Sequence, residues 1–172
     1  MSERNLPARR GGKLALLLVA VLAGCGGSAH KTVVLQSVRG PGYRFQTLPG
    51  WSIARKAHVV TATRPGSATD LISVSTYRLP KVPTVAEIDA AARSLALTLH
   101  GKLDAKSVVR VAGKPARRYD LSYRKGGQDL GLRLVFVLRG KREFQLLCRW
   151  QSPPDGDLTQ ACDALARTFR PS

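Results

Sequence analysis

The sequence lacks the motifs that mark the commonest enzyme and metal sites. It has no Gly-x-Ser-x-Gly turn for a nucleophilic serine, no Walker-type phosphate loop and no His-Glu-x-x-His zinc helix. None of its three histidines is spaced from a cysteine as zinc-finger ligands are. Asp70, Asp120, Asp129 and the histidines could still meet in space as an acid/base site, but scattered surface positions are the preferred interpretation. We therefore predict no catalytic residues, no metal and no cofactor, and we expect no enzyme.

Acidic residues are scarce, with 11 Asp and Glu against 28 Lys and Arg and a formal net charge of +17. Nucleic-acid binding would need the basic residues on one face among aromatics. Arg124 and Lys125 lie at one predicted turn of a β-meander, and Arg139, Lys141 and Arg142 lie at the next, so the two groups belong to opposite ends of a sheet. We therefore predict no nucleic-acid partner. Contact of these five residues with anionic lipid or cell-wall polymer stays open, and so does a compositional bias without function.

Long hydrophobic runs are also absent, which excludes a membrane-spanning helix of about 20 apolar residues. Basic residues precede a short apolar stretch at 14–22, and Leu22-Ala23-Gly24-Cys25 ends it. This order is typical of a bacterial lipoprotein signal and predicts cleavage before Cys25 with lipid on its thiol. An ordinary signal peptide with a chance cysteine is the alternative. We expect residues 1–24 to be the signal, 25–31 a lipidated tether and 32–172 a single domain, anchored at the extracytoplasmic face of the bacterial cell membrane.

Only two cysteines remain once Cys25 carries lipid, and disulfides persist in an extracytoplasmic compartment. Cys148 and Cys162 are too far apart in sequence for a redox Cys-x-x-Cys motif. Alternation over 143–150 places Cys148 on the apolar face of a strand, and helical spacing over 157–169 places Cys162 on an inward stripe. We predict a structural disulfide between them.

The order of the predicted elements indicates an α+β fold. Thr84 and Glu87 form a capping-box pattern, which predicts that a helix begins there, and Gly101 is expected to end it in a left-handed conformation. A second helix is predicted at 157–169. Strands are predicted before the first helix at 32–38, 43–47, 58–64 and 71–78, and a meander of three strands after it at 119–123, 130–138 and 143–150. The helices should cover a central antiparallel sheet.

Several loose motifs, in order, resemble the PsbP-like family, which includes many actinobacterial lipoproteins. They are Tyr43-x-Phe45-x-x-Leu48-Pro49-x-Trp51, the Thr84 helix, the segment 111–116 and Thr168-Phe169. The resemblance implies an α/β/α sandwich around an antiparallel sheet. Trp51 and Trp150 are interpreted as core aromatics rather than as a binding platform. The resemblance also implies an accessory or binding protein without enzymatic activity. Together with the lipoprotein signal, this predicts a lipid-anchored, non-enzymatic binding or scaffolding protein with an envelope protein as partner. The alternative is a small-ligand carrier or an enzyme that uses a cleft between helix and sheet, and a concave apolar pocket would favour that alternative.

Overall fold

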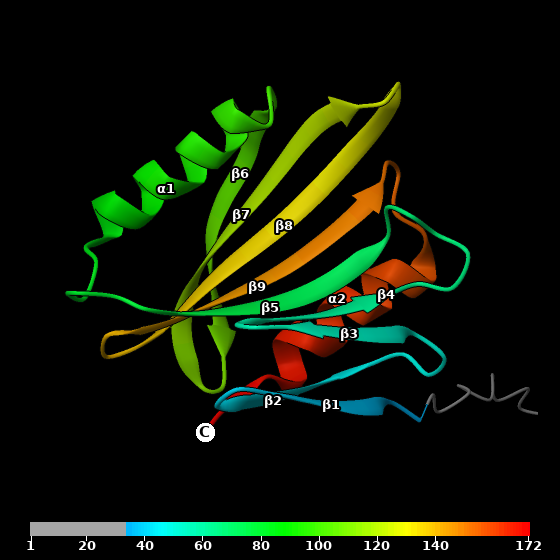
Figure 1. Ribbon diagram of the computed structural model, residues 1–172. Coiled ribbons are helices and arrows are strands. Elements are labelled where there is room, and N and C mark those ends of the chain that lie inside the picture. Colours follow the sequence, from blue (N-terminus) through cyan, green and yellow to red (C-terminus); the bar gives the residue numbers. More distant parts are fainter. Residues whose placement is uncertain (1–33) are drawn as a thin grey trace, which may run out of the picture. The chain divides into compact units, whose positions relative to one another are not determined.

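The protein is described here by a computed structural model of residues 34–172, which belong to one compact unit (Figure 1). The predicted signal at 1–24, the lipid site at Cys25 and the tether at 25–31 lie outside the described residues. No helix within the described part is long and apolar enough to cross a membrane.

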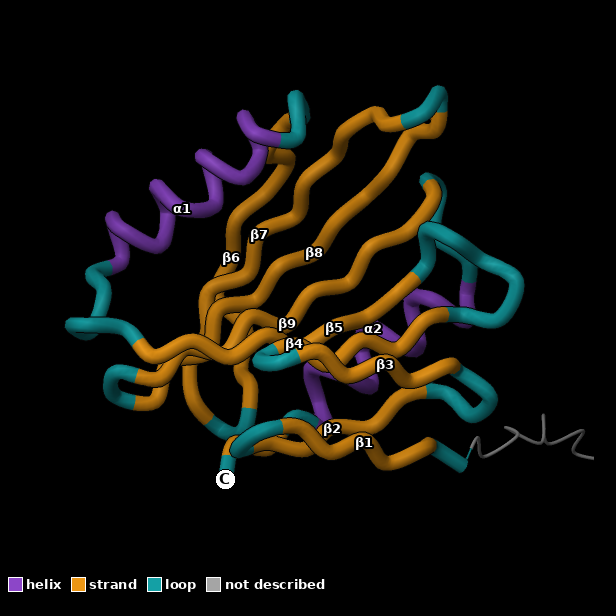
Figure 2. The backbone as a smooth tube through the Cα atoms, viewed as in Figure 1, coloured by secondary structure: helices purple, strands orange, loops and turns teal. Residues whose placement is uncertain are grey.

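A seven-stranded antiparallel sheet dominates the fold, with strand order β3-β4-β5-β9-β8-β7-β6. Its strands are β3 (Ser52–Lys56), β4 (Val59–Thr63), β5 (Leu71–Arg78), β6 (Lys102–Val111), β7 (Lys114–Lys125), β8 (Gln128–Arg139) and β9 (Arg142–Gln151). Tight turns join β7, β8 and β9, as Figure 2 shows, so the predicted meander is confirmed. The chain then differs from a simple meander, because it leaves β5 in the middle of the sheet and returns at the far edge as β6.

A smaller sheet contains β1 (Gln36–Gly40), β2 (Tyr43–Thr47) and the two-residue β10 (Arg170–Pro171). The β1–β2 hairpin turns at Pro41 and Gly42, where Gly42 has a φ of +76°. Tyr43 joins this sheet to the large one, because its hydroxyl donates a hydrogen bond of 2.9 Å to the carbonyl oxygen of Val74. Burial of this hydroxyl raises the pKa of Tyr43 to about 12.

Two helices complete the part of the fold that the structure describes: α1 (Val85–Thr98) and α2 (Gly156–Thr168). The alternation of β8 divides the hydrophobic residues into two clusters. Leu132, Leu134 and Phe136 form one cluster with α1, whereas Val135 and Val137 belong to the other, which contains α2 and the small sheet. The predicted antiparallel sheet with two helices is therefore present, and the sheet accounts for most of the fold.

The predicted start of α1 is confirmed, whereas its predicted end is wrong in one respect. The Thr84 hydroxyl accepts the amide of Glu87 at 3.2 Å, and the Glu87 carboxylate accepts the amide of Thr84 at 2.7 Å. At the other end His100, with a φ of 51°, adopts the left-handed conformation expected of Gly101. Gly101 serves a different need, since a Cβ there would lie 2.5 Å from the carbonyl oxygen of Ser122. The glycine lets the end of α1 approach β7 closely.

One polar contact fixes α1 against the sheet. The Tyr119 hydroxyl of β7 donates to Asp89 of α1 at 2.5 Å, and Lys106 of β6 lies 3.3 Å from the same carboxylate. The hydrogen bond from Tyr119 lowers the pKa of Asp89. Burial, reinforced by the carboxylate, raises the pKa of Tyr119.

Candidate functional site

Cys148 and Cys162 lie at disulfide distance, with their Cα atoms 5.8 Å apart. Both side chains are buried, as the predicted inward faces of the last strand and helix require. The pair connects the middle of α2 to β9.

Both ends of α2 are also attached to the rest of the fold. Asp155 caps the first turn by accepting the amide of Leu158 at 2.9 Å, and Arg64 pairs with Asp155 and Asp70. The backbone hydrogen bond, followed by the contact with Arg64, lowers the pKa of Asp155. At the C-terminal end the Thr168 hydroxyl accepts the amide of Gln46 at 2.8 Å, and the chain continues directly into β10.

A cleft of about 270 Å³ lies where α2 leaves part of the sheet uncovered. We call it the α2 cleft. One wall is α2 with Cys162, Leu165 and Ala166, and the opposite wall is the sheet. The sheet side is apolar at its base, where β6, β8 and β9 contribute Val109, Val135, Leu146 and Cys148.

Polar side chains converge at the α2 cleft from two neighbouring strands. Arg118 of β7 donates to Asp120 through Nε at 3.0 Å and Nη2 at 2.5 Å, and Arg133 of β8 donates to the same carboxylate through Nε at 2.9 Å. The register explains this contact, because Asp120 lies directly opposite Arg133. Arg133 also lies 5.9 Å from the ring centroid of Trp150, a cation–π distance. The two arginines are therefore held in place before any ligand arrives.

The hydrogen bonds to Asp120 leave part of each guanidinium free of a described hydrogen-bond partner. They use Nε and Nη2 of Arg118 and Nε of Arg133, so Nη1 of Arg118 and both terminal nitrogens of Arg133 remain. Asp163 is 3.9 Å from Arg133 Nη1, too far for a hydrogen bond. Together with Arg167 of α2, the α2 cleft carries three arginines and two aspartates and so has a net positive charge.

The structure places the five predicted basic residues in two separate groups. Arg124 and Lys125 end β7 and are exposed, with Arg124 Nε 3.8 Å from Asp129. Arg139, Lys141 and Arg142 lie at the β8–β9 turn, at the other end of the meander. Neither group lines the α2 cleft.

The predicted core aromatics occupy different environments. Trp51 is 5% exposed in the cluster of α2. Trp150 is half-buried at the edge of that cluster, opposite Gly131. Gly131 is required there, because a Cβ would lie 2.2 Å from the Trp150 ring.

The acid/base alternative gains no geometric support from the described residues. Within 34–172 no three His, Cys, Asp or Glu side chains gather as metal ligands. Asp70 contacts Arg64 and Asp120 contacts two arginines. His58 lies beside Tyr77, and His100 follows the C-terminal end of α1.

Sequence reasoning missed Arg118 and Arg133 as site residues. The alternation of β7 could have indicated the position of Arg118. Tyr119, Leu121 and Tyr123 occupy one face of this strand. Arg118 and Asp120 therefore lie on the opposite face. The sequence does not indicate that α2 covers only part of the sheet face on which Arg118 and Asp120 lie.

Solved structures share this architecture at low sequence identity. The cyanobacterial PsbP (CyanoP) of Synechocystis sp. PCC 6803 is 14% identical with a TM-score of 0.59, and the match covers 88% of this chain and 99% of that one. The fold is PsbP-like. LpqN of Mycobacterium tuberculosis, described as involved in cell envelope biogenesis, is 13% identical with a TM-score of 0.56, covering 80% of this chain and 90% of LpqN.

A protein of Bacteroides thetaiotaomicron is 13% identical with a TM-score of 0.57 over 80% of this chain. The match covers 48% of that protein, so this chain spans about half of its length. No protein family model and no curated protein matches the sequence. The PsbP-like resemblance is thus confirmed for the fold, whereas lipoprotein status and an actinobacterial origin remain predictions.

Proposed function

We propose that this protein is a lipid-anchored, extracytoplasmic binding protein of the cell envelope that holds a small ligand in the α2 cleft. The ligand has an apolar body and an anionic group, and the protein binds it without converting it. Cys25 carries the lipid, and an envelope protein delivers or receives the ligand. In this proposal α1 and α2 are the outer layers of an α/β/α sandwich, and the α2 cleft opens at the edge of the α2 layer.

The single observation that carries the proposal is the concave, apolar α2 cleft with its convergent arginines. Its volume of about 270 Å³ exceeds the ~150 Å³ of an apolar cavity that accepts one benzene ring. A ligand body of roughly two rings, or a short branched chain, therefore fits. Ligand sites are commonly apolar clefts with a few placed polar groups, so this geometry favours the small-ligand carrier over the scaffold that the sequence favoured.

The charge of the α2 cleft supports an anionic group on the ligand. Arg118 and Arg133 share the single carboxylate of Asp120, and Arg167 forms no ion pair with a described carboxylate. A guanidinium binds carboxylate, sulfonate or phosphate oxygens through paired N–H donors. Because Asp120 already orients both arginines, little side-chain freedom is lost when a ligand binds.

The envelope location rests on two supports of different kinds. The order of basic, apolar and small residues before Cys25 is that of a lipoprotein signal. LpqN, which shares the fold, is described as involved in cell envelope biogenesis.

Fluorescence of anilinonaphthalene sulfonate tests the α2 cleft, because this probe has one sulfonate and a two-ring naphthalene body that fits the cleft, while its anilino ring can project from the open mouth. We expect saturable binding to residues 34–172 and a change in the emission of Trp150. Ala166→Phe, which fills the α2 cleft from α2, should abolish binding, and Arg167→Gln should weaken it. Arg93→Gln on α1 removes the same charge elsewhere and should leave binding unchanged.

The melting temperature of each variant confirms that it is folded, since partly unfolded proteins bind this probe non-specifically. Equal probe binding by the folded wild type and Ala166→Phe would refute the proposed site. Equal losses in Arg167→Gln and Arg93→Gln would show that only net charge matters and would refute the anionic recognition.

A further inference from the structure

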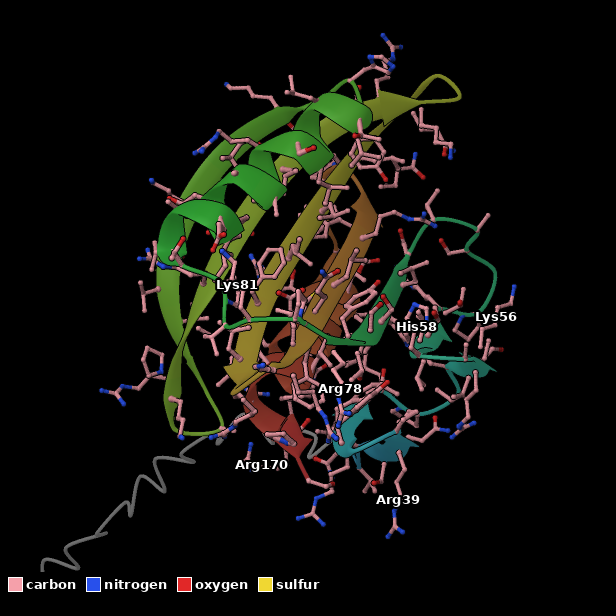
Figure 3. All side chains as sticks on the ribbon, turned by 60° about the vertical axis from the view of Figure 1, so that its left-hand side comes forward. Arg39, Lys56, His58, Arg78, Lys81 and Arg170 are labelled. Atoms are coloured by element: carbon pink, nitrogen blue, oxygen red, sulfur yellow. A yellow bond between two sulfur atoms is a disulfide. The ribbon has the colours of Figure 1, made fainter. Side chains whose placement is uncertain are left out.

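The strand register gathers arginines at the end of the large sheet next to the β1–β2 hairpin. Arg142 of β9 lies directly opposite Arg78 of β5 on one side and Arg139 of β8 on the other. Opposite residues share a face, so the three side chains form a row on the side that also carries the small sheet. We call this the arginine row. Figure 3 labels Arg78 at this end of the large sheet.

The arginine row has no acidic partner in the described part of the chain. None of its three members forms an ion pair with a described carboxylate. Glu143 is the next residue to Arg142, but alternation directs it to the opposite face, where it accepts a hydrogen bond from Gln145. Like charges directly opposite one another destabilise a sheet, so an anion between them would relieve repulsion.

The arginine row borders a hollow of about 450 Å³ lined by Arg78, Arg142, Thr76 and the Pro41-Gly42 turn. Nη1 of Arg142 lies close to the hairpin turn, because a Cβ at Gly42 would lie 2.7 Å from it. The hairpin glycine thus gives the guanidinium room at the wall of the hollow.

Two buried polar atoms at this end lack a hydrogen-bond partner among the described residues: Thr76 Oγ1 and Arg139 Nε. Thr76 precedes Arg78 by two positions and so shares its face. Buried polar atoms are nearly always hydrogen-bonded, so each of these two atoms lacks a partner that a bound group would supply, and Thr76 is the one of the two residues that lines the hollow.

We propose that the arginine row, with the hydroxyl of Thr76, is a binding site for a phosphate group. Arg78 and Arg142 supply paired N–H donors to its oxygens, and the β1–β2 turn forms the wall of the site. This inference goes beyond the proposed function. The arginine row lies six residues along β8 and β9 from Arg133 and Cys148, about 20 Å at the rise of a strand, so the two sites can fail independently.

The sequence already contains a matched control for the charge. Arg78→Gln with Arg142→Gln removes two positive charges at the arginine row, and Arg124→Gln with Lys125→Gln removes two at the opposite end of the meander. Both double variants of residues 34–172 therefore have the same net charge. Only the first alters the proposed site.

The assay titrates inorganic phosphate at constant ionic strength, with chloride as the replaced anion, and follows binding heat and melting temperature. We expect saturable binding that raises the melting temperature of the wild type and of the Arg124→Gln, Lys125→Gln control. In the arginine-row variant binding should be weaker by about tenfold or more. Anilinonaphthalene sulfonate binding in the α2 cleft should be unchanged in both.

A second arm uses phosphatidylcholine vesicles with and without phosphatidic acid. If the phosphate is that of a lipid headgroup, vesicle binding requires phosphatidic acid and is lost only in the arginine-row variant, even where free phosphate binds weakly. If the phosphate belongs to a soluble ligand, free phosphate saturates the site and vesicles do not. Equal losses in the two double variants, or no response to either probe in the folded wild type, would overturn the proposal.

Discussion

Reduction of the Cys148–Cys162 pair should destabilise the domain by an amount that can be worked out from the length of the loop. The two residues are 14 positions apart. On the chain-entropy estimate, closing a loop of this length stabilises the folded state by about 3 kcal/mol at room temperature. A domain of this size has an unfolding entropy of roughly 0.3 kcal/mol/K, so the melting temperature should fall by about 10 °C on reduction.

The assay compares residues 34–172, made in an oxidising compartment, with and without a reductant. The oxidised protein should show no free thiol until it is unfolded and reduced. The double variant Cys148→Ala, Cys162→Ala is the control, because its melting temperature should not respond to reductant. Two titratable thiols in the native oxidised protein, or the same melting temperature with and without reductant, would refute the reasoning.

Three further predictions concern single positions. Asp155→Ala removes the cap of α2 and the partner of Arg64, so stability should fall by denaturant titration. Folding lowers the pKa of Asp155, so the ionised carboxylate stabilises the folded state at any pH above its unfolded pKa. This stabilisation is lost as the pH falls through the folded pKa. The difference in unfolding free energy between wild type and variant should therefore shrink in acid. Gly131→Ala should lower the free energy of unfolding by about 1–3 kcal/mol and shift the fluorescence emission of Trp150. Gly156→Ala is the control and should not destabilise the domain, because a Cβ there meets nothing within 4 Å. Cys25→Ser should abolish lipid labelling and detergent-phase partitioning in a bacterial host, and unchanged partitioning would contradict the anchor.

The strands and helices that could be predicted are those in which buried and exposed residues alternate with the regular period of a strand or a helix. β7, β8 and β9 alternate strongly, because each has a face against one of the two hydrophobic clusters. β3 and β6 were missed since both are edge strands with mostly exposed residues, which leaves little alternation to read. β10 is only two residues long and exists through pairing with β2, a contact that no local pattern encodes.

The candidate site was predictable only where it depends on local pattern. The inward positions of Cys148 and Cys162 follow from strand and helix periods. The α2 cleft depends on how far α2 extends across the sheet, which is a property of tertiary packing. The arginine row depends on register between β5 and β9, strands that are separated by α1 and the rest of the meander.

The attachments of α2 have a consequence for motion. Moving this helix would require breaking the Asp155–Arg64 contact, the link to Cys148 and the Thr168–Gln46 hydrogen bond together. Amide hydrogens of α2 should therefore exchange with solvent only in large, rare openings, whereas α1, held mainly by one apolar stripe and Asp89, should exchange through smaller ones. Access to the α2 cleft would then require only side-chain rotations and no movement of α2, so the affinity of a guest, rather than an opening of the helix, would set how long it stays bound.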